Sequence, residues 1–475
     1  MPTKSGDLDP LEPALIRHAV ILMIGGLASL LNTTIVGVAL EDARIALAAD
    51  TEQIQWVATA HLLTLAVVVP AMPWALSRVG PRALWRSSLL IFAVASLLCG
   101  AAWSTPSLIV FRILQGIGSG LILPVLQTIL ATMAGPRRLG RVMALVAVPG
   151  QLAPLLGPVL GGILIDGPGW RWVFWVSVPL SIAALVLSWH GLPETVPADP
   201  RPFDLRGLLL LCPGLAVLLY GGTRLAASTD VLSAGPPIAL GTVLLLGYTH
   251  RALRRRHPLV DLRLFGERAF ALSCGLMMLA GASIFGPMVL LPLFYQQVRG
   301  ATGVETGLLL APLALGTMAV LPLAGRLTDR FGPRVLLIVG TVVAAAGTVP
   351  YVAALDAIDP ALSVALFLRG VGLGLATVPI AAAAYMRLSP EAIPEATTLL
   401  SVIQRIGGSF GTAFLLAIVA RHLATGGSAP QAYAIAFGAT LILSLLALVP
   451  AALLPRREPV SPDSDTTGSA ARPVR

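Results

Sequence analysis

The sequence predicts an all-α polytopic membrane protein, and its composition, its apolar blocks and the placement of its arginines support that prediction. Of the 475 residues, 56% are hydrophobic and 12% are charged, whereas soluble chains carry roughly 25% charged residues. The mean hydropathy is +0.85. The apolar residues form long blocks and not heptads or triplets, which excludes coiled coils and collagen. A soluble domain could not cover this much apolar surface.

Fourteen segments are predicted to cross the bilayer, because a spanning helix needs about 20 predominantly apolar residues. Eleven of these segments are uncharged, and three contain one arginine each, namely Arg112, Arg369 and Arg405. The segment 207–223 is the shortest of the set. In order, the predicted spans are 19–40, 54–77, 87–111, 107–133, 142–165, 172–193, 207–223, 231–250, 269–298, 306–325, 335–355, 360–386, 396–420 and 422–455.

The basic residues predict how these spans are oriented. If the chain starts inside, the two tails and the even-numbered connections hold 24 of the 32 basic residues, the outer connections hold five and the spans hold three. Lysine and arginine accumulate in cytoplasmic loops, so both termini are predicted to be cytoplasmic. The net charge of +9 is explained by this placement, and no nucleic-acid partner is expected.

An internal repeat divides the chain. Arg78-Val-Gly80-Pro81-Arg82 recurs as Arg330-Phe-Gly332-Pro333-Arg334, 252 residues later, and the arginine–glycine segment at 112–118 recurs about 257 residues later, at 369–374. Parallel repeats of this kind are a transporter architecture. The predicted organisation is a cytoplasmic N-terminal tail (1–18), a six-helix half (19–193), a linker with two additional helices and a basic cytoplasmic loop (194–268), a second six-helix half (269–455) and a disordered cytoplasmic tail (456–475).

Three motifs resemble those of the major facilitator superfamily, in its fourteen-helix drug:proton antiporter branch. Residues 325–334 resemble the cytoplasmic loop Gly-x-Leu-Ala-Asp-Arg-x-Gly-Arg-Arg, and residues 31–40 resemble Leu-Asp-x-Thr-Ile-Val-Asn-Val-Ala-Leu. Residues 153–162 are similar to the antiporter motif of the fifth span. The resemblance implies the major facilitator fold, with two six-helix halves, an inserted helix pair and 14 transmembrane helices. It also implies a monomer of the plasma (inner) membrane that exports small molecules against a proton gradient.

The candidate site residues form three sets, and the resemblance contributes to each. A substrate cavity is expected from polar residues within the spans. A cytoplasmic latch is expected from the two repeated loops, and a pivot that packs against the other half is expected from the small residues of the fifth span. The cavity set is Asn32, Thr33, Arg112, Gln115, Gln151, Tyr295, Gln296, Gln404 and Arg405; the latch set is Arg78, Gly80, Arg82, Gly325, Asp329, Arg330, Gly332 and Arg334; the antiporter-motif set is Gly150, Pro154, Gly157, Pro158, Gly161 and Gly162.

Two acidic residues of the family pattern are missing. Asn32 stands where the branch usually has aspartate, and Ser77 stands where the first latch loop has aspartate. Asparagine keeps the hydrogen bonding of aspartate but does not titrate. The candidates for proton coupling are therefore His61, Glu305 and Glu41, with a packing role for His61 as the alternative.

The absence of carboxylates from the middle of the spans bears on the substrate. Dications need an anionic partner in a low-dielectric cavity, so neutral, amphipathic or weakly anionic substrates are expected. The rival interpretations are an exporter of one dedicated metabolite or lipid and a facilitator without proton coupling.

Enzymatic activity and cofactors are not expected. Cys99, Cys212 and Cys274 stand singly, with no spacing typical of a metal site or a disulfide framework. No Gly-x-x-x-x-Gly-Lys-[Ser/Thr] loop for ATP is present. The expected partners are a small-molecule substrate, protons and membrane lipid.

Overall fold

Helices account for nearly all of the chain in the computed structural model, which describes residues 12–192, 202–227, 231–256, 258–353 and 359–455. These residues contain no strand. The helices are α1 (Pro13–Ala46), α2 (Thr51–Val79), α3 (Pro81–Gly100), α4 (Thr105–Asp166), α5 (Trp172–Trp175), α6 (Ser177–Gly191), α7 (Leu205–Ala227), α8 (Val231–Arg254), η1 (Leu262–Gly266), α9 (Arg268–Gln297), α10 (Gly303–Phe331), α11 (Pro333–Ala346), α12 (Pro350–Ala353), α13 (Asp359–Tyr385), η2 (Pro390–Ala392), α14 (Ile393–Ala424), α15 (Ala429–Leu446) and α16 (Leu448–Leu453).

Several helix boundaries differ from the predicted ones because local capping decides them. Helix α3 ends at Gly100 and not at residue 111, and a capping box between Ser104 and Ser107 starts α4. The last span begins at Ala429 and not at residue 422, because α14 continues to Ala424 and the chain turns at Gly426, with φ of 82°. Helix α1 starts at Pro13, inside the predicted tail 1–18. The tail 456–475 lies outside the described residues.

The 62-residue helix α4 contains two spans that run in opposite directions. Leu126 of the first arm (105–134) and Pro149 of the second arm (138–166) both lie beside Gly26 of α1. Further along α1, Asn32 meets Arg112 and Thr34 meets Ala153. The first arm is thus antiparallel to α1 and the second is parallel to it, so α4 folds back between them, as the predicted spans 107–133 and 142–165 require.

Eleven segments of the described chain are long and apolar enough to cross a membrane. The three other predicted spans are also helical, and they correspond to the second arm of α4, to α7 and to α8. Within the described residues, Leu205–Leu218 of α7 is an apolar helical stretch that is shorter than a full span. The fold is therefore that of a polytopic helical membrane protein, and the count of fourteen spans stays a prediction.

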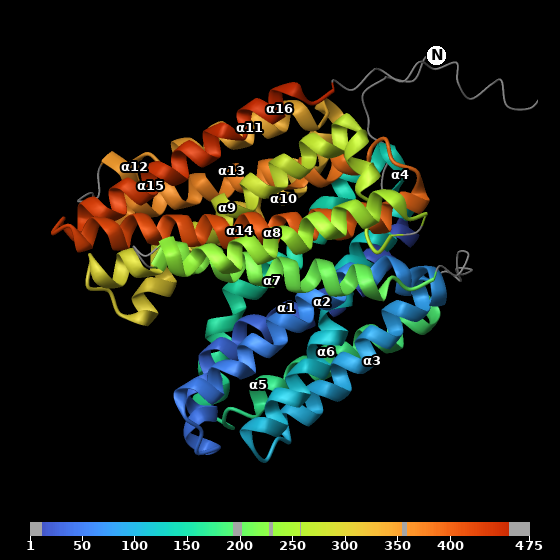
Figure 1. The fold of residues 1–475 in the computed structure, drawn as a ribbon, viewed down its shortest axis with the longest axis horizontal. Helices are drawn as coiled ribbons and strands as arrows, with labels where there is room; N and C mark the ends of the chain where they lie inside the picture. The colour runs from blue at the N-terminus through green and yellow to red at the C-terminus, as the bar shows by residue number, and fades with distance from the viewer. Residues whose placement is uncertain (1–11, 193–201, 228–230, 257, 354–358, 456–475) are drawn as a thin grey trace, which may run out of the picture.

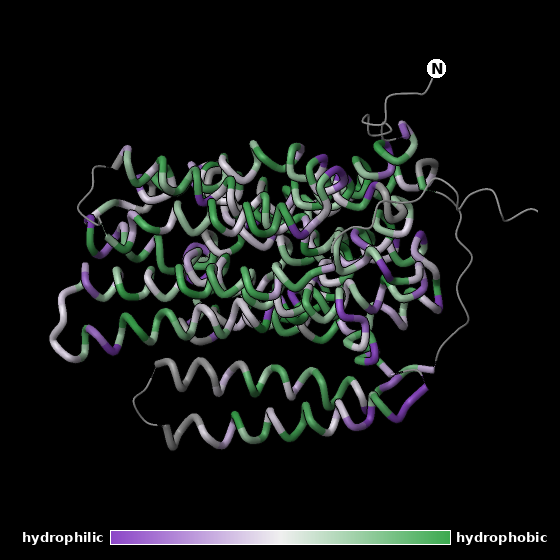
Figure 2. Tube along the Cα trace, turned by 90° about the horizontal axis from the view of Figure 1, so that it is seen from above, coloured by the Kyte–Doolittle hydropathy of each residue, from purple (hydrophilic) through white to green (hydrophobic). Residues whose placement is uncertain are grey.

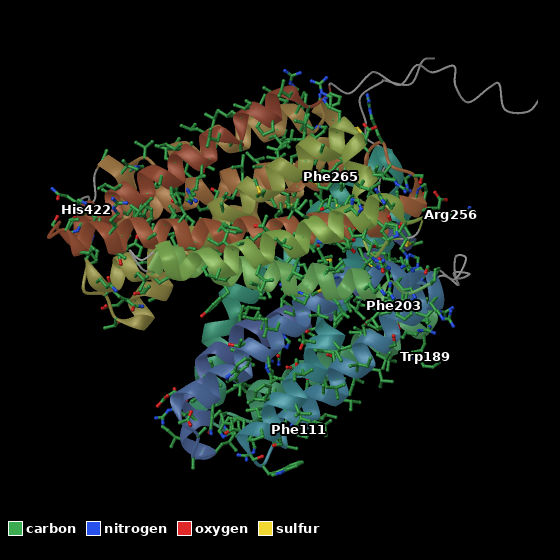
Figure 3. All side chains as sticks on the ribbon, in the orientation of Figure 1. Phe111, Trp189, Phe203, Arg256, Phe265 and His422 are labelled. Atoms are coloured by element: carbon green, nitrogen blue, oxygen red, sulfur yellow. The ribbon has the colours of Figure 1, made fainter. Side chains whose placement is uncertain are left out.

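The repeat is visible in the backbone. Gly80 (φ 77°, ψ 161°) and Gly332 (φ 80°, ψ 161°) adopt the same conformation, each ending one helix and starting the next at a proline. Positive φ is favourable for glycine alone. Helices α1 to α6 and α9 to α16 form two groups that converge at one end of the molecule and spread apart toward the other (Figure 1). Phe111 and His422 mark the spread ends, and Phe203 and Arg256 mark the converging end (Figure 3).

Helix packing corrects the register of the second repeat. Gly116 lies against α2 and Gly118 lies against α3, whereas Gly370 lies against α10 and Gly372 lies against α11. Since α2 corresponds to α10 and α3 to α11, these glycines correspond at an offset of 254 and not about 257. Arg369 is therefore the counterpart of Gln115, and Arg112 has no arginine counterpart. The glycines in both segments allow close helix packing.

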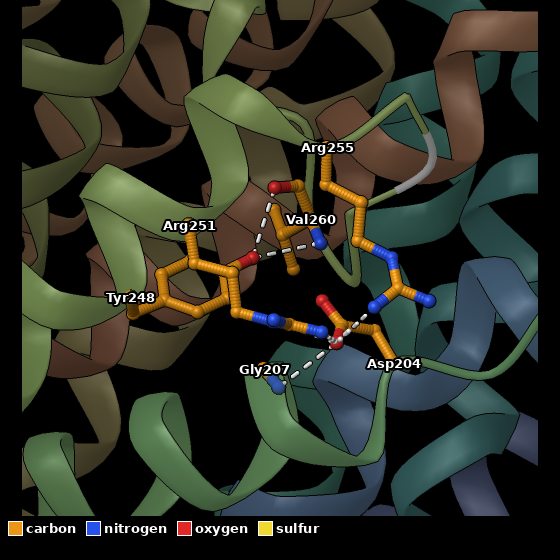
Figure 4. Close-up of polar contacts among 6 residues, drawn as sticks. All are labelled: Asp204, Gly207, Tyr248, Arg251, Arg255 and Val260. Atoms are coloured by element: carbon orange, nitrogen blue, oxygen red, sulfur yellow. Dashed lines mark hydrogen bonds and ion pairs between the residues drawn. The ribbon is translucent and has the colours of Figure 1, made fainter.

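Helices α7 and α8 form the inserted pair, a hairpin beside the main body with its hydrophilic residues at one end (Figure 2). Helix α7 packs against both α2 and α14, and so touches both groups. Asp204 caps α7 by accepting a hydrogen bond from Gly207 N at 3.0 Å. The same carboxylate oxygen accepts hydrogen bonds from Arg251 Nη2 at 2.8 Å and Arg255 Nη1 at 3.1 Å (Figure 4). Asp204 therefore clamps the start of α7 to the end of α8.

Candidate functional site

Arg112 is the centre of a polar network inside the first group of helices. Its side chain is 2% exposed. Nη1 donates to Asn32 Oδ1 of α1 at 3.0 Å and to Gln115 Oε1, and Nε donates to the carbonyl oxygen of Val57 on α2 at 3.1 Å. Gln115 Nε2 in turn donates to Ser96 Oγ on α3 at 2.7 Å. Neutral oxygens from α1, from α2 and from α4 itself thus solvate a buried charge, as a charge at membrane depth requires.

Two atoms beside this network lack a hydrogen-bond partner among the described residues. His61 is 1% exposed, and its Nδ1 lies 3.4 Å from the carbonyl oxygen of Arg112. Its other ring nitrogen, Nε2, is buried and unpartnered, and so is Asn32 Nδ2. A buried polar atom without a partner is unfavourable by ~1–3 kcal/mol. His61 Nε2 can take a proton, whereas Asn32 Nδ2, an amide donor, can only donate to an acceptor such as a buried water molecule.

The second group of helices contains a related network around Arg369 of α13, which is also 2% exposed. Nη1 donates to Thr348 Oγ1, in the turn between α11 and α12, and Nη2 donates to the carbonyl oxygen of Ser283 on α9 at 2.7 Å. Ser283 Oγ lies 2.8 Å from Ser444 Oγ on α15. As at Arg112, these acceptors are neutral oxygens.

The two groups of helices are joined at the converging end by Asp329 of α10, and we call this end the latch end. The carboxylate accepts hydrogen bonds from Gly140 N at 2.8 Å and from Arg141 Nε at 2.9 Å, both at the start of the second arm of α4. A Cβ added at Gly325 would lie 2.8 Å from Arg141 Cα. Glycine therefore allows α10 and α4 to touch here.

The corresponding loop of the first group makes no such contact through Ser77. Ser77 Oγ donates to the carbonyl oxygen of Trp74 in its own helix, at 2.8 Å. Arg78 is exposed, and Arg82 Nη2 donates to the carbonyl oxygen of Trp189 at the end of α6. In the second loop, Arg330 lies over the ring of its neighbour Phe331, and Arg334 is half-buried. Of the predicted latch residues, Asp329 and Gly325 are the two that the described contacts place across the seam.

The antiporter motif packs inside its own group of helices in this conformation. A Cβ at Gly157 would lie 2.3 Å from Thr34 Oγ1 of α1, and Thr34 Oγ1 donates to the carbonyl oxygen of Ala153 at 3.1 Å. Gly150 and Gly162 face open space, and Gly161 is buried. Close contact between the two groups of helices is described nearer the latch end, at Gly140 and Gly325, and the contact of the motif with the other half stays a prediction. The side chains of Pro154, Pro158 and Gln151 lie outside the described part of the chain.

The predicted cavity residues divide into exposed and buried ones. Thr33, Gln296 and Arg405 are exposed, and Gln404 is half-buried. Asn32, Arg112, Gln115 and Tyr295 are buried within their own groups, where they support the wall and do not line it. Tyr295 Oη lies 2.7 Å from Tyr351 Oη, inside a cluster of aromatic rings with Phe294, Tyr433 and Phe437.

Arg405 lies 12 residues into α14, deep in the predicted membrane region. Exposed Phe410 and Phe414 lie about 140° and 180° around the helix from it, at 100° per residue. An arginine facing lipid at this depth costs at least ~2.5 kcal/mol. We therefore expect its exposed side chain to lie at the seam between the two groups of helices.

The two glutamates proposed for proton coupling lie at helix ends. Glu41 forms an ion pair with Arg44 at 2.6 Å, and the hydrogen bond from Arg44 holds the pKa of Glu41 below its ordinary value. Glu305 caps α10, accepting a hydrogen bond from Thr302 N at 2.8 Å in a capping box. His61 is the candidate that lies inside the polar network.

Sequence reasoning missed the partners of the key charges. The sequence identifies Gly140 and Arg141 only as part of a basic loop. The glycine beside the arginine was the available signal, because glycine allows another backbone to approach closely. Ser283 and Thr348, which bind Arg369, gave no sequence signal, because single hydroxyl residues are common in apolar helices. The Asp204 clamp had a signal, since an aspartate directly before an apolar run is typical of a helix cap.

Comparisons with known proteins agree with this geometry. A family model described as Major Facilitator Superfamily matches residues 22–412. The chain is 38% identical over 413 residues to a multidrug resistance protein B homolog of Mycobacterium tuberculosis, covering 86% of this chain and 76% of that protein. It is 28% identical to the uncharacterized MFS-type transporter YcnB of Bacillus subtilis, covering 90% and 92%. Among solved structures, the human organic anion transporter MFSD10 is similar in fold, with a TM-score of 0.65, 16% identity, and coverage of 93% and 100%.

Proposed function

Because this chain belongs to the Major Facilitator Superfamily, we propose that it exports hydrophobic or amphipathic small molecules by alternating access, in exchange for protons. It is a membrane transporter and not an enzyme. The multidrug resistance relative, over 86% of this chain, supports export of the multidrug type. The observation that carries the mechanism is the arrangement of the two groups of helices, joined through Asp329 at one end and spread apart at the other.

The orientation follows from charge. The latch end carries arginine-rich connections: Arg256 lies there (Figure 3), shortly after Arg254 at the end of α8, and Arg330 follows Asp329 of α10. With lysine and arginine on the inside, the latch end and both termini are cytoplasmic. We further propose that the protein acts as a monomer in the inner (plasma) membrane. The described conformation is then closed toward the cytoplasm and spread toward the outside, the state from which an exporter releases its substrate.

The proposed substrates are neutral, amphipathic or weakly anionic. The exposed polar groups among the predicted cavity residues are Thr33, Gln296 and Arg405, with Gln404 half-buried. The buried charges at Arg112 and Arg369 are bonded to neutral oxygens. A dication entering this region would meet positive charge without a carboxylate to balance it, at an energy that grows as the dielectric falls.

Proton coupling is proposed at His61. The imidazole titrates near neutrality in its ordinary state, and its unpartnered Nε2 lies beside the Arg112 network. The charged groups that face it are Arg112 on α4 and Arg405 on α14. A proton on His61 adds a second positive charge beside Arg112 and favours a rearrangement. Glu305 and Glu41 remain the alternative carriers, although both are exposed at helix ends.

One observation favours a second candidate. Asn32 binds Arg112 where a titrating aspartate is usual in this branch, which supports a facilitator that moves its substrate without protons. The export of one dedicated metabolite or lipid is the other alternative, and a broad panel of compounds distinguishes it from multidrug export.

The test is transport into proteoliposomes that contain the purified protein, with an imposed pH gradient and a panel of fluorescent neutral, anionic and dicationic compounds. Proton-coupled export predicts accumulation that a protonophore abolishes, and that His61→Ala reduces more than Glu305→Gln or Glu41→Gln. Accumulation that ignores the protonophore identifies the uncoupled facilitator. Full dependence on the pH gradient in all three variants contradicts the proposed carriers, and a dication as the best substrate contradicts the proposed substrate class.

A further inference from the structure

Helix α9 contains a main-chain carbonyl that its own helix does not satisfy. In an α-helix the N–H of each residue bonds the carbonyl four residues earlier. Pro287 has no N–H, so the carbonyl of Ser283 loses its partner. Ser283 is 5% exposed and lies in a predicted membrane span, where water does not reach it. Such a carbonyl needs a donor from a neighbouring helix.

Arg369 supplies that donor. Its Nη2 lies 2.7 Å from the Ser283 carbonyl oxygen and 3.5 Å from Ser283 Oγ. Its Nη1 donates to Thr348 Oγ1 at the break between α11 and α12. One planar guanidinium therefore joins α13 to two places where the helical hydrogen-bond pattern is interrupted, a geometry that lysine, with a single point charge, does not reproduce.

We propose that Arg369 is a positioning residue that replaces the donor missing at Pro287 and so sets the direction of the last part of α9, residues 288–297. That part carries Gln296, which is exposed, and Tyr295, which bonds Tyr351. A guanidinium–carbonyl bond in apolar surroundings is stronger than an ordinary amide–carbonyl bond. The direction of α9 beyond Pro287 therefore depends on the pairing of Arg369 with the Ser283 carbonyl. Its consequence for transport rests on the proposed function, but the pairing itself does not.

The test is a double-mutant cycle between Arg369→Met and Pro287→Ala. Pro287→Ala restores the N–H that Ser283 lacks, so Arg369 should become largely dispensable in that background. Arg369→Met alone should lower the apparent Tm in detergent by roughly 5 °C, and by less than half as much beside Pro287→Ala. Pro292→Ala is the matched control, because it lies in the same helix but restores a donor to the carbonyl of Met288, which Arg369 does not contact. In that background the full loss of Tm should persist.

A second readout reports the direction of α9. The native Cys99, Cys212 and Cys274 are buried, so a thiol reagent applied to Gln296→Cys reports mainly on position 296. Arg369→Met should change the labelling rate several-fold, Arg369→Lys should change it less, and Pro287→Ala should return it toward the parent rate. In transport, the KM for a fluorescent probe should rise more than Vmax falls.

The outcomes separate clearly. The proposal is overturned if Arg369→Met lowers the Tm equally in the parent and in the Pro287→Ala background, or if the labelling rate at position 296 is unchanged. If Arg369→Met does not reach the membrane, the double variant with Pro287→Ala must reach it. The proposal is also overturned if the double variant is absent from the membrane. The Tm cycle and the labelling do not require transport. If the protein transports none of the probes, the proposed function fails, but these two measurements still test the pairing of Arg369 with Pro287.

Discussion

Asp329 and Arg141 form an ion pair across the seam between the two groups of helices, with Arg141 Nε 2.9 Å from Asp329 Oδ2. The same carboxylate also accepts a hydrogen bond from Gly140 N at 2.8 Å, and its side chain is 4% exposed. In the other repeat Ser77 bonds its own helix. Of these two equivalent loop positions, Asp329 is thus the one that carries an acid and bonds across the seam.

The first prediction concerns Asp329→Asn. Asparagine keeps one acceptor but loses the charge, which should weaken the closed state by about 2 kcal/mol, or ~30-fold in the equilibrium between closed and open latch ends. Ala144, which is 4% exposed and lies against Gly325, should become accessible. The measurement is thiol labelling of Ala144→Cys. Arg330→Gln is the control, because Arg330 lies over Phe331 of its own helix, and equal labelling in both variants would contradict the assignment.

The second prediction concerns Asn32→Asp. A carboxylate at this position gives the buried Arg112 guanidinium an opposite charge and removes the unpartnered Nδ2 of Asn32. Since Arg112 is already buried, the variant should be more stable than the parent, by about 2 kcal/mol. Asn32→Ala should instead be less stable, because Arg112 loses an acceptor. Apparent Tm values in detergent check the two directions, and the prediction is wrong if the aspartate variant is the less stable one.

Much of the fold could be predicted because membrane insertion imposes it on the sequence. Twenty-residue apolar runs and arginine-rich loops locate the spans, and the Arg-x-Gly-Pro-Arg repeat located two loops whose glycines, Gly80 and Gly332, share one backbone conformation. The ends of the spans were harder, because a capping box at Ser104 and a turn at Gly426 decide them locally.

The site was less predictable because its contacts join distant residues. Asn32 and Arg112 were both named as polar residues within the spans, but their hydrogen bond depends on how α1 packs against α4. The register of the second repeat was wrong by three residues because arginines were matched, whereas the packing aligns Gly116 with Gly370. Arg369 corresponds to Gln115 in the first repeat, and the buried arginines of the two repeats therefore stand at positions three residues apart.

The third prediction concerns the clamp at Asp204. Burial raises the pKa of this carboxyl, but hydrogen bonds from Arg251 and Gly207 and the charge of Arg255 outweigh it, so the pKa lies below its ordinary value of 3.8. A lowered pKa in the folded state means that the stabilisation is complete at pH values well above 3.8 and is lost as the pH falls through the folded-state pKa.

Asp204→Asn should therefore lower the stability by about 2 kcal/mol at neutral pH. The difference in Tm between the parent and this variant should shrink below pH 3.8. Asp42→Asn, at an exposed carboxylate, is the control and should have little effect at any pH. If the difference in Tm between the parent and Asp204→Asn instead grows as the pH falls, the predicted direction of the pH dependence is wrong. The charge of Asp204 then does not hold α7 to α8.

The fourth prediction uses two glycines of the same helix, α10. A methyl group at Gly325 would lie 2.8 Å from Arg141 Cα and 2.9 Å from Ala144 Cβ, whereas one at Gly307 would meet nothing within 4 Å. Alanine is favoured over glycine in a helix interior by about 1 kcal/mol, so both variants gain the same helix propensity and differ only in the contact with α4. Gly325→Ala should hold the latch end apart, raise the labelling of Thr328→Cys on the cytoplasmic side and slow transport at least tenfold. Gly307→Ala should transport at the parent rate. Equal transport by the two variants would mean that closure of α10 onto α4 is not a step of the cycle.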